Sequence, residues 1–178
     1  MLASKLTRLK GLEDQLLFSA GEFKSTVIGF VSAENKELTS SYHLVDGKWS
    51  PTVKNPTAYF PEIVKPVFLR PKRFIILIGG RGSGKTLVKG DHGLISMHDL
   101  GRNLMCIREF QSSITDSVHA VLSDEIKRLE LDNADVTERT VKFTHNNSMA
   151  RFMGLSRNPE SVKSAFGFLD WWIEEAQF

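Results

Sequence analysis

The stretch that decides the fold runs from Phe74 to Thr86 and reads FIILIGGRGSGKT. Five apolar residues (74–78) lead into a loop that matches the phosphate-binding pattern G-x-x-x-x-G-K-[ST]. Glycines let backbone N–H groups approach phosphate oxygens, and a helix that begins near Gly84 adds the positive end of its dipole. The residues expected to contact a nucleotide are Gly79, Gly80, Arg81, Gly82, Ser83, Gly84, Lys85 and Thr86.

Two side chains of this loop have separate chemical roles. Lys85 is expected to reach the β- and γ-phosphates, and the hydroxyl of Thr86 is expected to ligate Mg²⁺. The apolar run before the loop predicts a buried strand, which is the structural context that such a loop requires. The sequence therefore predicts a site for ATP and Mg²⁺.

The composition is that of an ordinary globular chain. The 178 residues are 41% hydrophobic and 25% charged, with a formal net charge of +2, enough for one core or one core plus a small appendage. No apolar run approaches the roughly 20 residues that a membrane-spanning helix needs. The single Cys106 excludes an intrachain disulfide and lies in an apolar run, which predicts a buried thiol in a reducing compartment.

The first 66 residues carry no motif that indicates a function. Residues 2–18 are expected to form an amphipathic helix, and residues 26–31 a strand. Residues 42–45, followed by Asp46-Gly47, predict a hairpin. Four of the six prolines fall within residues 50–66, which predicts an extended connector. We expect an N-terminal region over 1–66 and an ATPase domain over 67–178, incomplete at its C-terminus.

Strands and helices alternate after the loop. A helix is expected over 84–98, a strand over 103–108 and a longer helix over 112–131. This order predicts an α/β fold with a mostly parallel sheet and helices on both faces. Together with the loop over 79–86, it resembles the P-loop NTPase fold (ASCE/RecA-like). Leu77 and Ile107 should then be fully buried. The remaining expected elements are a strand pair over 141–144 and 149–155, a short helix after Asn158, and a strand over 168–173.

Two acids end the last predicted strand. Glu174 is expected to act on the metal side, and Glu175 to orient and deprotonate an attacking water. Asp170 is a rival for the metal-side acid. It has no adjacent second carboxylate, however, and it lies roughly 13 Å further back along an extended strand.

Four segments together resemble the ATPase domain of phage terminase large subunits, the motors that package double-stranded DNA into capsids. The resemblance covers about residues 67–178. The segments are the loop 79–86, the stretch 107–114 leading into Ser117-Val118, the segment 152–155, and Trp172-Ile173-Glu174-Glu175-Ala176.

The resemblance implies a role for each matching residue. Lys85 and Thr86 would hold phosphate and Mg²⁺, Glu174 would be the metal-side acid and Glu175 the catalytic carboxylate. Arg81 corresponds to the loop arginine that acts near the γ-phosphate. A cation from a neighbouring subunit often completes such sites, and Arg157 and Lys163 are candidates for that role.

The resemblance also implies partners and a location. These are double-stranded DNA, a portal protein and a small terminase subunit, with no membrane. The chain is expected to be a monomer in isolation and a homo-oligomeric ring on the procapsid, in the host cytoplasm. The family's metal-dependent nuclease half has no counterpart in residues 1–178. Two alternatives stay open: another DNA-translocating ATPase or helicase, and a nucleotide-binding assembly module without useful turnover.

Overall fold

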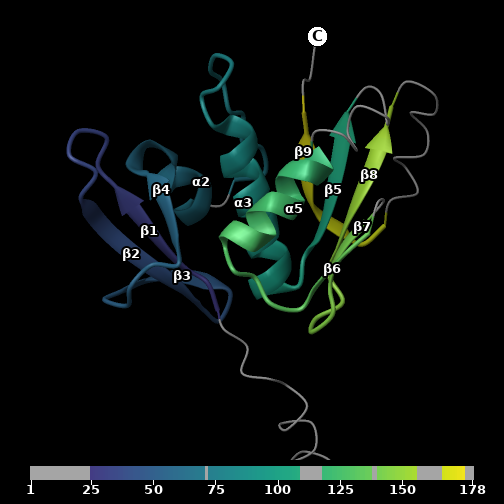
Figure 1. Ribbon diagram of the computed structural model, residues 1–178, viewed down its shortest axis with the longest axis horizontal. Helices are drawn as coiled ribbons and strands as arrows, with labels where there is room; N and C mark the ends of the chain where they lie inside the picture. The colour runs from purple at the N-terminus through teal and green to yellow at the C-terminus, as the bar shows by residue number, and fades with distance from the viewer. Residues whose placement is uncertain (1–24, 71, 109–117, 138–139, 156–165, 175–178) are drawn as a thin grey trace, which may run out of the picture.

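The computed structural model describes residues 25–70, 72–108, 118–137, 140–155 and 166–174. Two β-sheets flank a pair of helices in this part of the chain (Figure 1). The helix predicted over 2–18 and the short helix predicted after Asn158 lie outside the described residues.

The first sheet is built from the N-terminal part of the described chain. Its strand order is β3-β2-β1-β4, with β1 antiparallel to β2 and parallel to β4. Asp46 and Gly47 both have positive φ, 50° and 74°, as a two-residue hairpin turn requires, so the predicted hairpin is confirmed. The elements are β1 (Val27–Val31), β2 (Leu38–Val45), β3 (Lys48–Thr52), β4 (Ala58–Pro61), the 3-10 helix η1 (Glu62–Val64) and α2 (Lys65–Leu69).

The predicted connector over residues 50–66 is wrong. Most of this segment is regular structure, because its prolines occupy positions where a missing N–H does no harm. Pro51 lies on the edge strand β3 and Pro61 ends the edge strand β4. Pro66 lies in the first turn of α2. Prolines are tolerated at sheet edges and in first helical turns.

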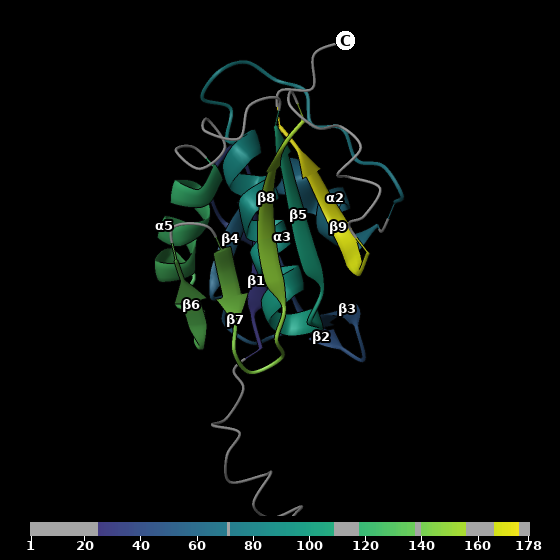
Figure 2. The same cartoon turned by 90° about the vertical axis from the view of Figure 1, so that its right-hand side faces the viewer.

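The second sheet has the order β6-β7-β8-β5-β9 (Figure 2). β5 is parallel to both β8 and β9, whereas β6, β7 and β8 are antiparallel neighbours. The expectation of a mostly parallel sheet is therefore corrected to a mixed one, because short turns can join only antiparallel strands. The elements are α3 (Lys85–Leu100), β5 (Asn103–Arg108), α5 (Ala120–Arg128), β6 (Ala134–Val136), β7 (Thr140–Phe143), β8 (Met149–Gly154) and β9 (Phe168–Ile173).

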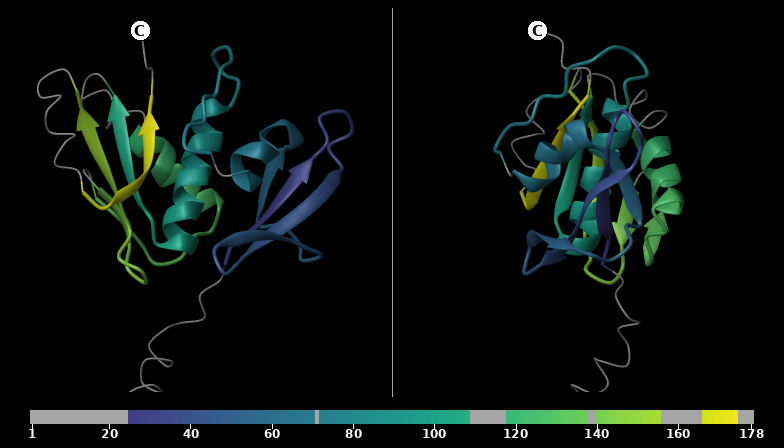
Figure 3. Two further views of the ribbon diagram at one scale, coloured as in Figure 1. Left: turned by 180° about the vertical axis from the view of Figure 1, so that it is seen from behind. Right: turned by 90° about the vertical axis from the view of Figure 1, so that its left-hand side faces the viewer.

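Helices α3 and α5 lie between the two sheets (Figures 1 and 3). Helices were expected on both faces of the second sheet, but within the described residues both of its helices cover the same face. Buried side chains from both sheets and both helices form one continuous cluster that includes Phe30, Phe68, Leu94, Leu122 and Phe143. The domain boundary expected at residue 67 stays a prediction.

The predicted strand over 74–78 is wrong. This segment is not a strand in the structure, and Phe74, Ile76 and Ile78 are 78%, 80% and 91% exposed. Leu77 is only half-buried, not fully buried as expected. The physical reason is that an apolar run becomes a strand only beside a pairing partner, and no described strand pairs with it. Ile107, in contrast, is 3% exposed on β5, as predicted.

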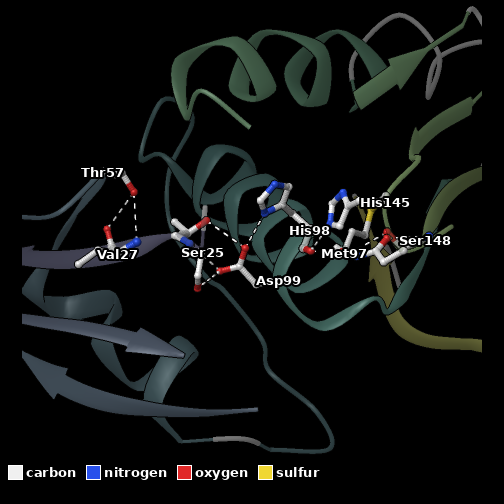
Figure 4. A network of polar contacts seen from close by, with 10 residues as sticks. Ser25, Val27, Thr57, Met97, His98, Asp99, His145 and Ser148 are labelled. Carbon is white, nitrogen blue, oxygen red and sulfur yellow. Dashed lines mark hydrogen bonds and ion pairs between the residues drawn. The ribbon is translucent and has the colours of Figure 1, made fainter. Parts of the chain in front are cut away.

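A polar network joins the C-terminal end of α3 to both sheets (Figure 4). The buried carboxylate of Asp99 accepts hydrogen bonds from the Thr26 N–H at 2.9 Å and from the hydroxyls of Ser25 and Thr26. On the other side, the Ser148 hydroxyl donates to the Met97 carbonyl at 2.8 Å. The last turn of α3 is thus attached to the first sheet through a side chain and to the second through its own carbonyl groups.

Candidate nucleotide-binding site

The loop over residues 79–84 lies at the edge of the molecule towards which the parallel strands β5, β8 and β9 point (Figure 3). Gly82 and Gly84 have φ of 78° and 79°, a conformation that side chains with a Cβ rarely adopt. A Cβ on Gly79 would lie 2.8 Å from the Ser83 hydroxyl oxygen. These glycines are therefore required by the shape of the loop itself.

Lys85 places a positive charge in the middle of this loop. Its ammonium group donates hydrogen bonds to the carbonyl oxygens of Gly79 and Gly80 at 2.7 and 2.8 Å, and to the Ser83 hydroxyl at 3.0 Å. Gly84 is the N-cap of α3, so the N–H groups of the first helical turn have no acceptor within the helix. The ammonium, the free N–H groups and the helix dipole all favour an anion at this position.

Thr86 and Glu174 meet across the gap between α3 and β9. The Thr86 hydroxyl donates to Glu174 Oε1 at 3.1 Å. The backbone N–H of Glu174 donates to the Ile107 carbonyl at 2.9 Å, which continues the β9–β5 pairing and fixes the position of the acid. The second carboxylate oxygen, Oε2, is buried and has no hydrogen-bond partner.

This pair of residues fits Mg²⁺. A hydroxyl oxygen and a carboxylate lie together, and a buried carboxylate oxygen without a partner favours a cation. Within the described residues, no three acidic, histidine or cysteine side chains form a metal-binding group. A metal at Thr86 and Glu174 would therefore take its other ligands from water and phosphate, as Mg²⁺ commonly does.

Asp170, the rival acid, lies elsewhere. Its carboxylate accepts a hydrogen bond from the Ser96 hydroxyl in the fourth turn of α3, and it lies 3.7 Å from Arg102. Ser96 was not singled out from the sequence. Helical periodicity gave no signal for it, because ten residues at 3.6 per turn place positions 86 and 96 about 80° apart around the helix.

Two further titratable groups lie between α3 and β5. Burial lowers the pKa of Lys89 below its usual value, although Asp170 acts in the opposite direction. Burial raises the pKa of the Cys106 thiol above its usual range, and this residue is fully buried as predicted. Cys106 is therefore a packing residue and not a nucleophile.

The remaining predicted residues are placed only in part. Arg81 is exposed at the tip of the loop, where its side chain faces solvent. Glu175, Arg157 and Lys163 lie outside the described residues.

Comparison with known proteins supplies the family. Residues 71–178 match the family model described as phage terminase large subunit. The chain belongs to this family. The resemblance noted from the four sequence segments is thereby confirmed, and the match contains the phosphate loop, β5 and β9. A terminase large subunit has a role in phage DNA packaging.

A search of curated proteins found no match. In the part of the terminase chain that the structure describes, no helix is long and apolar enough to cross a membrane.

Proposed function

We propose that this chain is the ATP-hydrolysing motor domain of a DNA-packaging terminase. It would couple the hydrolysis of ATP to ADP and phosphate to the translocation of double-stranded DNA into a procapsid. The observation that carries the proposal is the Thr86–Glu174 contact, which joins the phosphate loop to the acidic end of β9 although the two residues are 88 positions apart.

Each residue of the site has a proposed role. The loop N–H groups and Lys85 bind the phosphates. Thr86 and Glu174 would hold Mg²⁺, which would supply positive charge beside the transferred phosphoryl group. Glu175 accepts the proton of the attacking water. Arg81 stabilises charge near the γ-phosphate, and an additional cation comes from a neighbouring subunit, with Arg157 and Lys163 as the candidates.

Family membership supports the proposed setting. The partners are double-stranded DNA, the portal protein and the small terminase subunit. The chain acts as a homo-oligomeric ring docked on the procapsid in the host cytoplasm and is a monomer when isolated.

The test is a phosphate-release assay with and without double-stranded DNA, combined with calorimetric measurement of nucleotide binding. Lys85→Ala should abolish ATP binding, because the triphosphate loses its paired charge. Glu175→Gln should keep ATP and Mg²⁺ affinity and lose about 10²–10⁴ in rate, because an amide cannot accept the proton.

Two results would contradict the proposal. Unchanged ATP affinity in Lys85→Ala would remove the phosphate loop from the site. Nucleotide binding without any hydrolysis in the assembled motor would instead favour an assembly module that binds nucleotide without turnover.

A further inference from the structure

Helix α3 and strand β9 touch at three levels, and only the first belongs to the proposed nucleotide site. At one end, Thr86 donates to Glu174. In the middle, the Trp172 ring packs over Gly90, where an added Cβ would lie 3.8 Å from the ring. At the other end, Ser96 donates to Asp170.

The spacing of these contacts follows from the geometry of the two elements. Residues 170, 172 and 174 share one face of β9 because side chains alternate along a strand. From residue 86 to residue 96 a helix advances about 15 Å, and from residue 170 to residue 174 a strand advances about 13 Å. The two polar contacts therefore fix α3 and β9 side by side at both ends of a shared span.

Apart from these contacts with α3, β9 is held by its pairing with β5. It is the edge strand of its sheet and, within the described chain, pairs only with β5. Leu169, Trp171 and Ile173, on its opposite face, are 71%, 37% and 58% exposed. Pairing with β5 holds Glu174 in line with the sheet, and the position of Glu174 relative to Thr86 depends in addition on the contacts that β9 makes with α3.

The Ser96–Asp170 contact is well protected from solvent. Ser96 is 5% exposed, and the Asp170 side chain is 17% exposed. Two cations lie near this carboxylate: Arg102 at 3.7 Å and Lys89, on which Asp170 acts electrostatically. A hydrogen bond to a charged, mostly buried acceptor is among the stronger contacts available to a hydroxyl.

We propose that Ser96 and Asp170 are positioning residues that hold Glu174 opposite Thr86 and so set the Mg²⁺ affinity of the site. This inference rests on the proposed function. Asp170 acts on the metal only through the placement of β9 against α3. Removing residues that position a metal's ligands without binding the metal commonly changes metal affinity by about 10–100-fold.

The experiment measures ADP binding to the full chain by calorimetry, in EDTA and over a series of Mg²⁺ concentrations. Ser96→Ala and Asp170→Ala should each raise the Mg²⁺ concentration for half-maximal binding about tenfold. ADP affinity in EDTA should not change, because the loop and Lys85 are intact. Asp170→Asn, which keeps an oxygen acceptor for Ser96, should stay within about threefold of the parent.

Asp124→Asn is the matched control, because it removes an exposed acid on α5 whose side chain is 78% exposed. It should behave as the parent does. Ser96→Ala also separates positioning from direct ligation, since it leaves the Asp170 carboxylate in place. If Asp170→Ala does not fold, the Mg²⁺ dependence of ADP binding in Ser96→Ala is sufficient to test the inference.

Three results would overturn the inference. The first is a Mg²⁺ dependence of Ser96→Ala within twofold of the parent. The second is an equal loss of ADP affinity in EDTA, which would indicate general damage to α3. The third is an Asp170→Asn protein that needs as much Mg²⁺ for half-maximal ADP binding as Asp170→Ala does. That result would show that the charge of Asp170, and not its hydrogen bond with Ser96, sets the Mg²⁺ affinity. A parent chain without Mg²⁺-dependent nucleotide binding would instead refute the proposed function, and the inference with it.

Discussion

Ile107 and Leu77 are aliphatic residues with very different surroundings. Ile107 is 3% exposed at the centre of the second sheet, between β8 and β9. Leu77 is half-buried in a segment that no described strand pairs with. A charge introduced at Ile107 would lack both water and a partner, whereas a charge at Leu77 can reach solvent.

We therefore expect Ile107→Asp to prevent folding and Leu77→Asp to be tolerated. An unpaired buried charge costs several kcal/mol, which is a large part of a total stability of about 5–15 kcal/mol. Circular dichroism during thermal melting checks both variants, with Ile107→Val as the control for a change of shape alone. A cooperatively melting Ile107→Asp protein would show that the position of β5 is wrong.

At the scale of elements, α3 and α5 are joined by a charged cluster whose two carboxyl groups are buried. Arg128 on α5 lies 2.6 Å from Asp91 on α3 and also pairs with Glu125. Asp91 and Glu125 are 3% and 6% exposed. Burial, followed by the neighbouring Glu125 carboxyl, raises the pKa of Asp91 to about 7, against the opposing effect of Arg128.

The raised pKa gives the stability a pH dependence of known sign. The native state holds the Asp91 proton more tightly than the unfolded chain does. The protonated Asp91 carboxyl therefore stabilises the fold at low pH, and this stabilisation is lost as the pH rises towards 7. His92 acts in the opposite sense, because burial lowers its pKa to about 4. The neutral His92 imidazole contributes stability above its unfolded pKa of about 6.5, and this stability is lost as the pH falls towards 4.

Asp91→Asn isolates the first effect, because the amide mimics the protonated carboxyl and does not titrate. The stability difference between the parent and Asp91→Asn should shift by roughly 2 kcal/mol in favour of the variant between pH 5 and pH 7.5. Urea unfolding at each pH measures it, with the exposed Asp124→Asn as the control. A difference that does not vary with pH would contradict the raised pKa.

Two glycines let α3 pack closely against its neighbours. A Cβ on Gly93 would lie 2.7 Å from a methyl carbon of Leu104, and one on Gly90 would lie 3.3 Å from Val121. Leu104 is fully buried, so its side chain has little room to move away.

Gly93→Ala should destabilise the chain by about 1–3 kcal/mol through overpacking, although alanine favours a helix by about 1 kcal/mol. Thermal unfolding measures the loss. Introducing Gly93→Ala into a Leu104→Ala background should remove most of this penalty, because the clashing methyl groups are gone. The same penalty in both backgrounds would show that the close approach of α3 to β5 is not its cause.

On the scale of the whole molecule, the two sheets share one buried cluster and one polar network. The cluster runs from Ile28 and Phe60 in the first sheet to Val141 and Phe152 in the second. At the end of α3, Asp99 anchors β1 (Figure 4). A shared core of this kind favours a single cooperative unfolding transition.

Trp49 lies in the first sheet, and Trp171 and Trp172 both lie on β9 in the second. A chain with Trp171 and Trp172 replaced by Phe therefore reports on the first sheet, and a chain with Trp49 replaced by Phe reports on the second. Their urea midpoints should coincide in the presence of Asp99. In Asp99→Ala, the first sheet, which Trp49 reports on, should unfold at a lower urea concentration than the second, because the donors of Ser25 and Thr26 lose a charged acceptor.

Thr57→Val is the control for this experiment, because among the described residues Thr57 hydrogen-bonds only to the Val27 backbone, within the first sheet. It should lower the midpoint slightly without separating the two signals. Separate transitions in the parent would instead make residues 1–66 and 67–178 independent domains.

The sequence by itself determined the local features. The glycine pattern of residues 79–84 determines the conformation of this loop, because backbone conformations with positive φ are a property of the residue type. The ranges of α3, β5 and β9 follow from periodicity and apolar runs, which depend on the immediate neighbours along the chain. Family membership also followed from short segments taken in order.

Only the tertiary structure decided which residues meet. Strand pairing made the second sheet mixed and gave residues 74–78 no partner among the described strands, because both outcomes depend on distant segments. Prolines within residues 50–66 fit strand edges and a helix start that only the fold defines. The contacts of Thr86 with Glu174 and of Ser96 with Asp170 join residues 88 and 74 positions apart. No local pattern assigns such pairs, because they exist only where packing brings α3 against β9.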